Sequence, residues 1–300
     1  MSGLVLLAPD FALIALGALL MRYGRFDTGF WIGVERLVYF ILFPALLFHS
    51  IVRTPFDFAK TGALVEAGLA GIAIGAALGY AARRFVRDDR LWASAVQCAF
   101  RFNSYIALAL ANRLGAEAGT ALMAILIGVA VPICNALAVV ALSRHSPHGL
   151  LRELARNPLL IATITGLACN FAGLVLPEPV AATLARLGSA SIALGLIAVG
   201  AGLRLQGLRE APVFAGYITF IKLVAVPAAA LGTGWWLGLN GLQLQIVVLF
   251  GALPTASSAY ILAQRMGGNG AVVAVLISLG TVVSAITVPL WLALARLVAA

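Results

Sequence analysis

An arginine and an asparagine stand near the middle of a long apolar stretch, Leu91–Gly115. A bilayer-spanning helix needs about 20 apolar residues, and this stretch is long enough to form one. A charge at that depth is costly and is usually retained for function. We therefore expect Arg101, Asn103 and the adjacent Ser104 to mark the functional centre of the protein.

A second apolar stretch, 242–267, repeats the first with a shift of 152 positions. The identical pairs are Ala107 with Ala259, Leu110 with Leu262, Ala111 with Ala263, Arg113 with Arg265, and Gly115 with Gly267. Such self-similarity indicates an internal duplication. In this alignment Pro254 and Thr255 fall on Phe102 and Asn103.

The second stretch also predicts an interrupted helix. Pro254 lacks an amide hydrogen and clashes with the preceding turn, so the helix is expected to open there. The first stretch has no proline, and a break near Asn103 is inferred from the repeat and from its polar residues. Where two broken helices meet, their free amide groups and positive dipole ends favour an anion.

The side chains around these breaks suit a carboxylate ligand, but each has a second interpretation. Arg101 can form two parallel hydrogen bonds to a carboxylate, or it neutralises a helix C-terminus or pairs with an acid. Asn103 can donate to the ligand, or it caps the broken helix. Thr255, Ser257 and Ser258 can also donate, or they are the small packing residues common in membrane helices.

Few other titratable residues lie inside apolar stretches. Lys222 is deep enough to need a partner, and we favour a structural charge that offsets helix dipole ends over a direct coupling role. Asp10 and His49 are expected near the same membrane face, where they can meet, and histidine titrates near neutral pH, so proton coupling is conceivable. Alternatively these two residues, and Glu66 with them, face the lipid headgroups.

The composition excludes a soluble domain. The chain is 62% hydrophobic and 10% charged, with a mean hydropathy of +1.05, whereas soluble domains have about 25% charged residues. The net charge of +9 comes mostly from basic residues at the ends of apolar runs, where membrane topology explains them, so nucleic acid is not implied. Three cysteines without paired spacing predict no metal site and no cofactor.

Ten apolar runs are long enough to be spanning helices. They are 3–21, 32–53, 60–83, 91–112, 117–142, 157–175, 179–203, 211–237, 242–265 and 270–296. The basic stretch 143–156 is expected to be a cytoplasmic linker between two repeats of five helices, 1–142 and 157–300. Five is odd, so the repeats must be inverted in the membrane, as in one large group of secondary transporters. The distribution of Lys and Arg places both termini outside.

Several motifs resemble the auxin efflux carrier family, which includes the plant PIN carriers and bacterial members. The second predicted span, from Glu35 to Ile51, is similar to the family's second helix in its Arg36, its Pro44 and its Phe48-His49 pair. Phe102-Asn103-Ser104-Tyr105 is similar to the family's fourth-helix motif, and Ala252-Leu253-Pro254-Thr255-Ala256 to its ninth. The resemblance covers essentially the whole chain.

The resemblance implies an all-helical membrane fold of the sodium/proton-antiporter and bile-acid-carrier type. Spans 1, 2, 6 and 7 would form a scaffold, spans 3–5 and 8–10 a transport domain, and broken spans 4 and 9 would cross beside the substrate. It also implies that Asn103 helps to hold a carboxylate, that Pro254 shapes the facing half-helix, and that Leu47 and His49 line the cavity. The chain lacks the long central loop of many plant members. The resemblance to the auxin-transporting members supplies no role for Arg101, so malate or malonate is favoured over auxin.

The expected function is therefore alternating-access, elevator-type transport of a small organic anion across a bacterial inner membrane, without enzymatic activity. The main alternative is a sodium-coupled symporter of bulkier anions on the same fold. Protons, sodium and uncoupled modes stay open, with sodium less favoured because the crossing offers oxygens but no acid. A hydrolase using His49 is disfavoured because no acid is placed to orient the imidazole, and a channel or purely structural protein has no need of a duplicated broken helix. A homodimer through the scaffold is consistent with the fold by analogy.

Overall fold

The computed structural model describes residues 3–24, 26–53, 58–142, 158–203, 212–256 and 258–299, and every regular element among them is helical. Six of the helical segments are long and apolar enough to cross a membrane, and two shorter apolar helices accompany them. The expected all-helical membrane protein is thus confirmed. The predicted linker 143–156 lies outside the described residues.

In chain order the helices are α1 (Gly3–Tyr23), α2 (Thr28–Leu37), η1 (Val38–Leu42), α3 (Phe43–Arg53), α4 (Phe58–Ala81), η2 (Ala82–Arg84), α5 (Asp89–Ala95), η3 (Val96–Ala99), α6 (Ser104–Leu142), α8 (Pro158–Phe171), α9 (Glu178–Ala201), α10 (Pro212–Phe220), η5 (Ile221–Ala225), α11 (Val226–Trp236), α12 (Gly241–Ala252), α13 (Ser258–Arg265) and α14 (Gly270–Ala299).

Both predicted stretches are interrupted. The first leaves helical geometry after η3 and resumes as α6 at Ser104. The second stops with α12 at Ala252, and α13 begins at Ser258 after the extended residue Leu253 and Pro254. The break at Pro254 follows from the missing amide hydrogen of proline. The break before Ser104 has no such local cause and matches the position inferred from the repeat.

Two π turns, η1 and η5, each end two residues before a proline. Proline crowds the carbonyl four residues earlier and cannot donate to it, and a widened turn gives that carbonyl room. Before Pro227 the affected carbonyl is that of Leu223, which instead accepts a 2.8 Å hydrogen bond from Trp291 Nε1. The π turn is therefore stabilised by α14.

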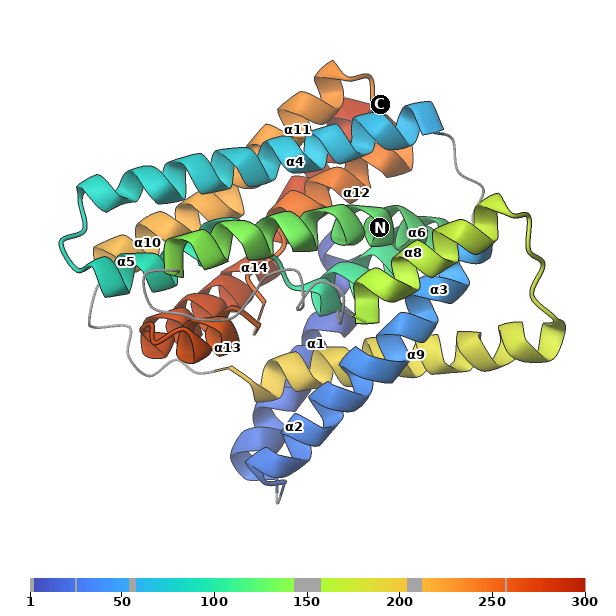
Figure 1. Cartoon of the computed structure of the whole chain (residues 1–300), viewed down its shortest axis with the longest axis horizontal. Coiled ribbons are helices and arrows are strands. Elements are labelled where there is room, and N and C mark those ends of the chain that lie inside the picture. The colour runs from blue at the N-terminus through green and yellow to red at the C-terminus, as the bar shows by residue number, and fades with distance from the viewer. Residues whose placement is uncertain are drawn as a thin grey trace.

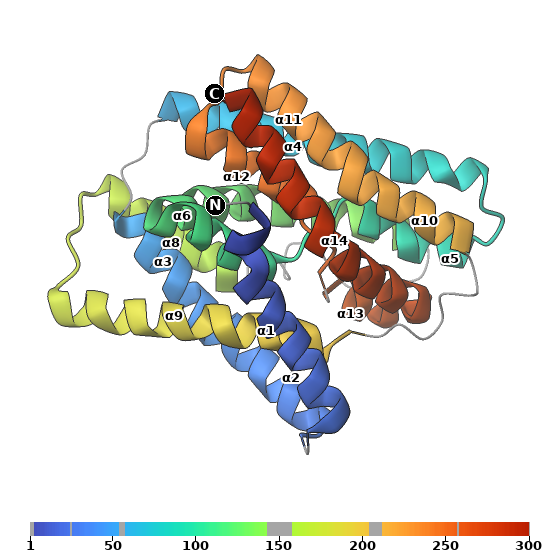
Figure 2. The ribbon, with the colours of Figure 1, turned by 180° about the vertical axis from the view of Figure 1, so that it is seen from behind.

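Helices α1, α3, α8 and α9 pack on one another, with α1 against α9 and α3 against both α8 and α9. In Figures 1 and 2, α9 and α2 lie at one side of the molecule. The crossing of α1 and α9 is very close, because a Cβ on Gly17 would overlap the carbonyl oxygen of Ile197 and a Cβ on Gly200 would overlap that of Ile14. Small residues allow this kind of backbone approach in membranes.

A second set of contacts joins α4, α6, α11, α12 and α14. Figure 1 shows α4 and α11 on the side opposite α9, with α6 between them. Helix α6 meets both sets, since it also contacts α3, α8 and α9. It is bent sharply where Gly115 (φ −147°, ψ 23°) and Ala116 (φ 46°, ψ −130°) leave helical geometry.

Candidate functional site

The two helix interruptions lie against each other. The backbone amide of Asn103 donates a 2.8 Å hydrogen bond to the carbonyl oxygen of Pro254, and the rings of Phe102 and Phe250 pack with centroids 4.6 Å apart. The two stretches related by the repeat thus meet at one point inside the molecule. This contact is the centre of the candidate site.

Asn103 caps the helix that follows it. Its Oδ1 accepts hydrogen bonds from the amides of Tyr105 at 2.9 Å and Ile106 at 3.3 Å, and the residue is only 2% exposed. An N-cap asparagine satisfies amide groups that have no partner within the helix. The side-chain oxygen of Asn103 therefore acts as a cap.

Thr255 and Gln97 tie the two interruptions together. Thr255 Oγ1 donates to the carbonyl oxygen of Cys98 at 2.9 Å. The buried Gln97 donates through Nε2 to the carbonyl oxygens of Ser94 at 3.1 Å and Ala259 at 3.2 Å. The sequence did not predict a role for Gln97, because the only sign of one is that a polar residue interrupts an apolar run.

Arg101 brings a positive charge to the same place. It is 9% exposed, and its Nη2 donates to Ser258 Oγ at 3.0 Å. Ser258 is the first residue of α13 and Ser104 the first residue of α6, so both predicted serines lie at helix starts beside the interruptions. Ser257 lies outside the described residues.

Lys222 supplies a second buried cation. It lies in the π turn η5, is 3% exposed, and donates from Nζ to the carbonyl oxygen of Gly251 at 2.9 Å. Gly251 is in the last turn of α12, where carbonyl groups lack helical partners and carry the negative dipole end. This is the contact expected of a charge that offsets a helix dipole at the crossing.

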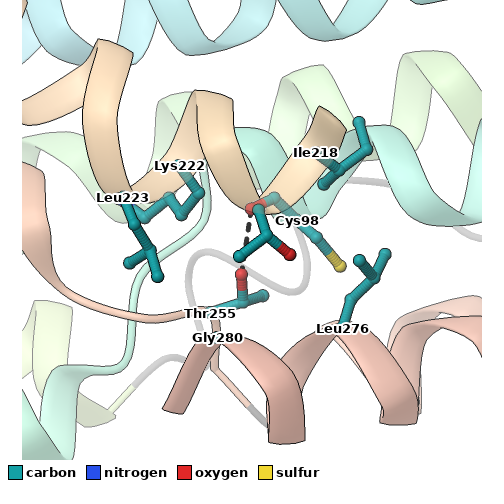
Figure 3. A pocket seen from close by; sticks show the side chains of 8 residues that line it. Cys98, Ile218, Lys222, Leu223, Thr255, Leu276 and Gly280 are labelled. Atoms are coloured by element: carbon teal, nitrogen blue, oxygen red, sulfur yellow. Dashed lines mark hydrogen bonds between the residues drawn. The ribbon is translucent and has the colours of Figure 1, made fainter. Parts of the chain in front are cut away.

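A small cavity lies beside this contact, and Figure 3 shows Lys222, Cys98 and Thr255 around it. Its remaining lining comes from α10, η5 and α14, namely Ile218, Thr219, Leu223, Leu276 and Gly280. The volume of about 10 Å³ is at the lower limit for one water molecule. An organic anion does not fit in it unless the surrounding helices move.

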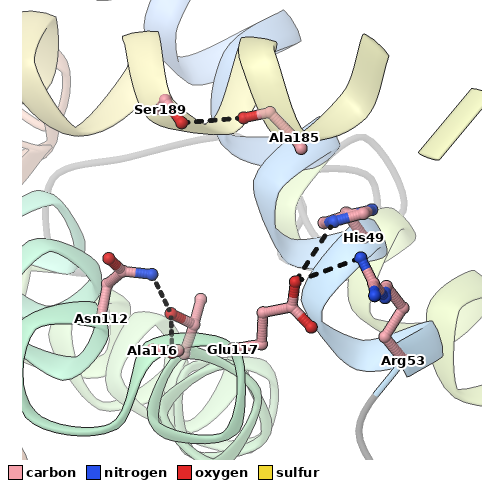
Figure 4. Close-up of polar contacts among 8 residues, drawn as sticks. His49, Arg53, Asn112, Ala116, Glu117, Ala185 and Ser189 are labelled. Carbon is pink, nitrogen blue, oxygen red and sulfur yellow. Dashed lines mark hydrogen bonds and ion pairs between the residues drawn. The ribbon is translucent and has the colours of Figure 1, made fainter. Parts of the chain in front are cut away.

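The predicted residues of the second span lie on α3. Leu47 is fully buried, and one turn before it Phe43 packs on Tyr105 with ring centroids 4.8 Å apart, which places α3 next to the start of α6. His49 is also buried, and it faces Glu117 of α6, with 3.7 Å between Nε2 and Oε1. Arg53 Nη1 lies 3.3 Å from the same oxygen (Figure 4).

Glu117 is the second residue that sequence reasoning missed. It follows the bend of α6, and nothing in the local sequence relates it to His49. The predicted meeting of His49 with Asp10 stays a prediction, because the side chain of Asp10 lies outside the described residues, although its backbone belongs to α1. Glu66 is exposed on α4, as the surface interpretation of this residue requires.

Comparison with known proteins agrees with this architecture. The family described as "Membrane transport protein" matches residues 142–292, half of the chain. A Rhizobium meliloti (strain 1021) protein named "Putative malonate transporter" is 28% identical over 290 residues, covering 89% of this chain and 87% of its own. An "Uncharacterized transporter" of Methanothermobacter thermautotrophicus is 26% identical, covering 97% of this chain and 95% of its own.

The "Uncharacterized transporter YfdV" of Escherichia coli (strain K12) is 28% identical over a shorter match, which covers 52% of this chain and 49% of its own. The matched family consists of membrane transport proteins and not of enzymes. Together with the apolar spanning helices, these matches show a multi-pass membrane transporter. The chain belongs to the membrane transport protein family that contains the auxin efflux carriers.

Proposed function

We propose that this transporter carries small organic anions, carboxylates of the size of malonate or malate, by alternating access. The observation that carries the proposal is the contact between the two helix interruptions, flanked by the buried cations Arg101 and Lys222. Buried positive charge and broken helices inside an apolar layer favour an anionic ligand. The name of the Rhizobium meliloti relative, which refers to malonate, supports the same chemical class.

The carboxylate would bind at the interruptions. Asn103 Nδ2 would donate to one of its oxygens, and Arg101 would provide a charge-assisted hydrogen bond. Thr255, Ser257, Ser258 and Ser104 would surround it with hydroxyl groups, and Lys222 would act through its charge. Leu47 and His49 would line the route along α3.

The cavity volume of about 10 Å³ supports a transport cycle with movement. We assign the structure to a conformation in which the cavity beside Lys222 is too small to hold the anion. The contacts among α1, α3, α8 and α9 suit a scaffold, and those among α4, α6, α11, α12 and α14 suit a moving transport domain. Ten spans arranged as two inverted repeats, 1–142 and 157–300, would give this domain its two-fold related half-sites.

The test is thermal stabilisation of the purified protein by a panel of mono- and dicarboxylates. A ligand that binds the folded state raises the melting temperature by mass action, corresponding to about 2.7 kcal/mol at 100 times Kd. We expect malonate or malate to stabilise the wild-type protein. Asn103→Asp and Asn103→Ser should both keep an N-cap and should both lose this stabilisation, since neither can donate from the Nδ2 position.

Asn240→Ala is the matched control, because Asn240 is exposed and its side chain makes no capping hydrogen bond to α12. It should respond to carboxylates like the wild type. If the two Asn103 variants respond normally, Asn103 is only a cap and the site assignment is wrong. Repeating the panel with sodium separates the alternative, a sodium-coupled symporter of bulkier anions, which predicts stabilisation only when sodium is present.

A further inference from the structure

The cluster of His49, Arg53 and Glu117 joins two helices that belong to different packing sets. His49 and Arg53 lie one turn apart on α3, and Glu117 reaches them from α6. The His49 side chain is 4% exposed, whereas Glu117 is 46% exposed. Neither imidazole nitrogen has a hydrogen-bond partner among the described residues, so the carboxylate of Glu117 is the polar group that faces this buried ring.

The backbone that carries Glu117 is held in an unusual conformation. Ala116 has a positive φ of 46°, a conformation that costs about 1–3 kcal/mol for a residue with a side chain. Asn112 Nδ2 donates to Thr120 Oγ1 at 3.2 Å, and Thr120 Oγ1 donates to the carbonyl oxygen of Ala116 at 2.9 Å (Figure 4). This bonded turn directs Glu117 towards α3.

The charges around His49 are few. Helix α8 carries no charged residue between Pro158 and Phe171, and η1 carries none either. The charged residues of α9, Glu178 and Arg186, are exposed. On α6 the other charge is the exposed Arg113. Among the residues that the structure describes, the negative group that attracts a protonated His49 is therefore Glu117, and the nearest positive group is Arg53.

We propose that His49 and Glu117, with Arg53, form a proton-binding site that joins α3 to α6. When His49 is neutral, Arg53 is the cation that Glu117 faces on α3. When His49 binds a proton, Glu117 faces two cations, and the attraction between α3 and α6 becomes stronger. The site links proton uptake to the relative position of these helices, and its role in transport rests on the proposed function, in which α3 belongs to the scaffold and α6 to the moving domain.

The test compares the melting temperatures of purified wild type and Glu117→Gln at about pH 6 and about pH 8.5, without carboxylate. The imidazole of His49 changes charge between these pH values, and the other groups that titrate there are the same in both proteins. Glu117→Gln should lower the melting temperature at both pH values because Arg53 loses its partner. The decrease should be larger by about 1–3 °C at the lower pH. In the His49→Gln background the decrease should be equal at both pH values.

Glu66→Gln is the matched control, since Glu66 is exposed on α4, and its effect should not depend on pH. The comparison of wild type with Glu117→Gln stands without the His49 variant if that variant fails to fold. An equal effect of Glu117→Gln at both pH values overturns the proton site. Because no carboxylate is present, a failure of this test leaves anion binding at Asn103 intact, and a failure of anion binding leaves this result intact.

Discussion

At the level of single residues, the polar side chains at the crossing hold the fold together, and the proposed function gives some of them a second role in binding the anion. Asn103 uses its oxygen as a helix cap, and in the proposed function its amide hydrogens would bind the anion. Lys222 uses one hydrogen bond to close the end of α12, and in the proposed function its charge would also attract the anion, because charges are weakly screened in a dry interior. Under the proposed function, these residues would therefore have both a structural and a functional role.

Lys222→Met tests this combined role. The substitution removes a hydrogen bond from a charged donor, worth about 1.5–3 kcal/mol, and should lower the melting temperature by about 3–8 °C. It should also weaken carboxylate binding about tenfold or more, because one buried positive charge is lost. Binding is measured by titration with malonate.

If Lys222→Met lowers the melting temperature but leaves the carboxylate affinity unchanged, Lys222 has only a structural role. The exposed Arg186 of α9 offers the control for loss of net charge. Arg186→Met should change neither the melting temperature nor the affinity appreciably.

At the level of helices, the packing of α1 against α9 depends on close contact between their backbones. Each helix contributes a glycine to this crossing. Gly17 of α1 lies against the carbonyl oxygen of Ile197, and Gly200 of α9 lies against that of Ile14. Neither helix has strong amphipathic character to guide it in lipid, so the shape of this contact decides how the pair docks.

Gly200→Ala should disrupt this pair. The added Cβ would overlap the carbonyl oxygen of Ile14, and overpacking of this kind costs about 1–3 kcal/mol. We expect the melting temperature to fall by about 2–8 °C. Gly232→Ala in α11, where nothing lies within 4 Å of the new Cβ, should leave it unchanged or raise it; equal effects of the two substitutions would contradict the importance of the contact.

The same helices show what sequence can predict. The break at Pro254 was predictable because proline acts on its own turn, and the break before Ser104 was predictable only because the repeat maps it onto Pro254. The π turns were not predicted, since their stabilisation includes the indole of Trp291 from another helix. Gln97 and Glu117 were missed for the same reason: their partners, Ala259 and His49, become neighbours only after α6 bends and the two stretches meet.

At the level of the whole molecule, the predicted duplication with five spans per repeat has consequences for orientation. The basic residues 143–156 are expected on the cytoplasmic side, and both termini on the other side. This arrangement would present the second repeat upside down relative to the first, so that the two interruptions approach the same midplane from opposite faces.

Reporter fusions test this orientation. A reporter that is active only outside the cytoplasm should be active when fused after Ala300, and inactive when inserted between residues 143 and 157. A cytoplasmic reporter at the same two positions should give the reverse pattern. Activity of one reporter at both positions would mean that the number of spans between them is even and not the predicted five.

The hydrogen bond from the amide of Asn103 to the carbonyl of Pro254 has a consequence for how such a protein diversifies. It uses only main-chain atoms, so the bond itself does not depend on the type of side chain at position 103, provided that this residue is not proline. This one contact would therefore persist when the side chains proposed to bind the anion change. Under the proposed function, Arg101 and Ser258 could be exchanged and the carried anion could change while this main-chain bond still joins the two broken helices.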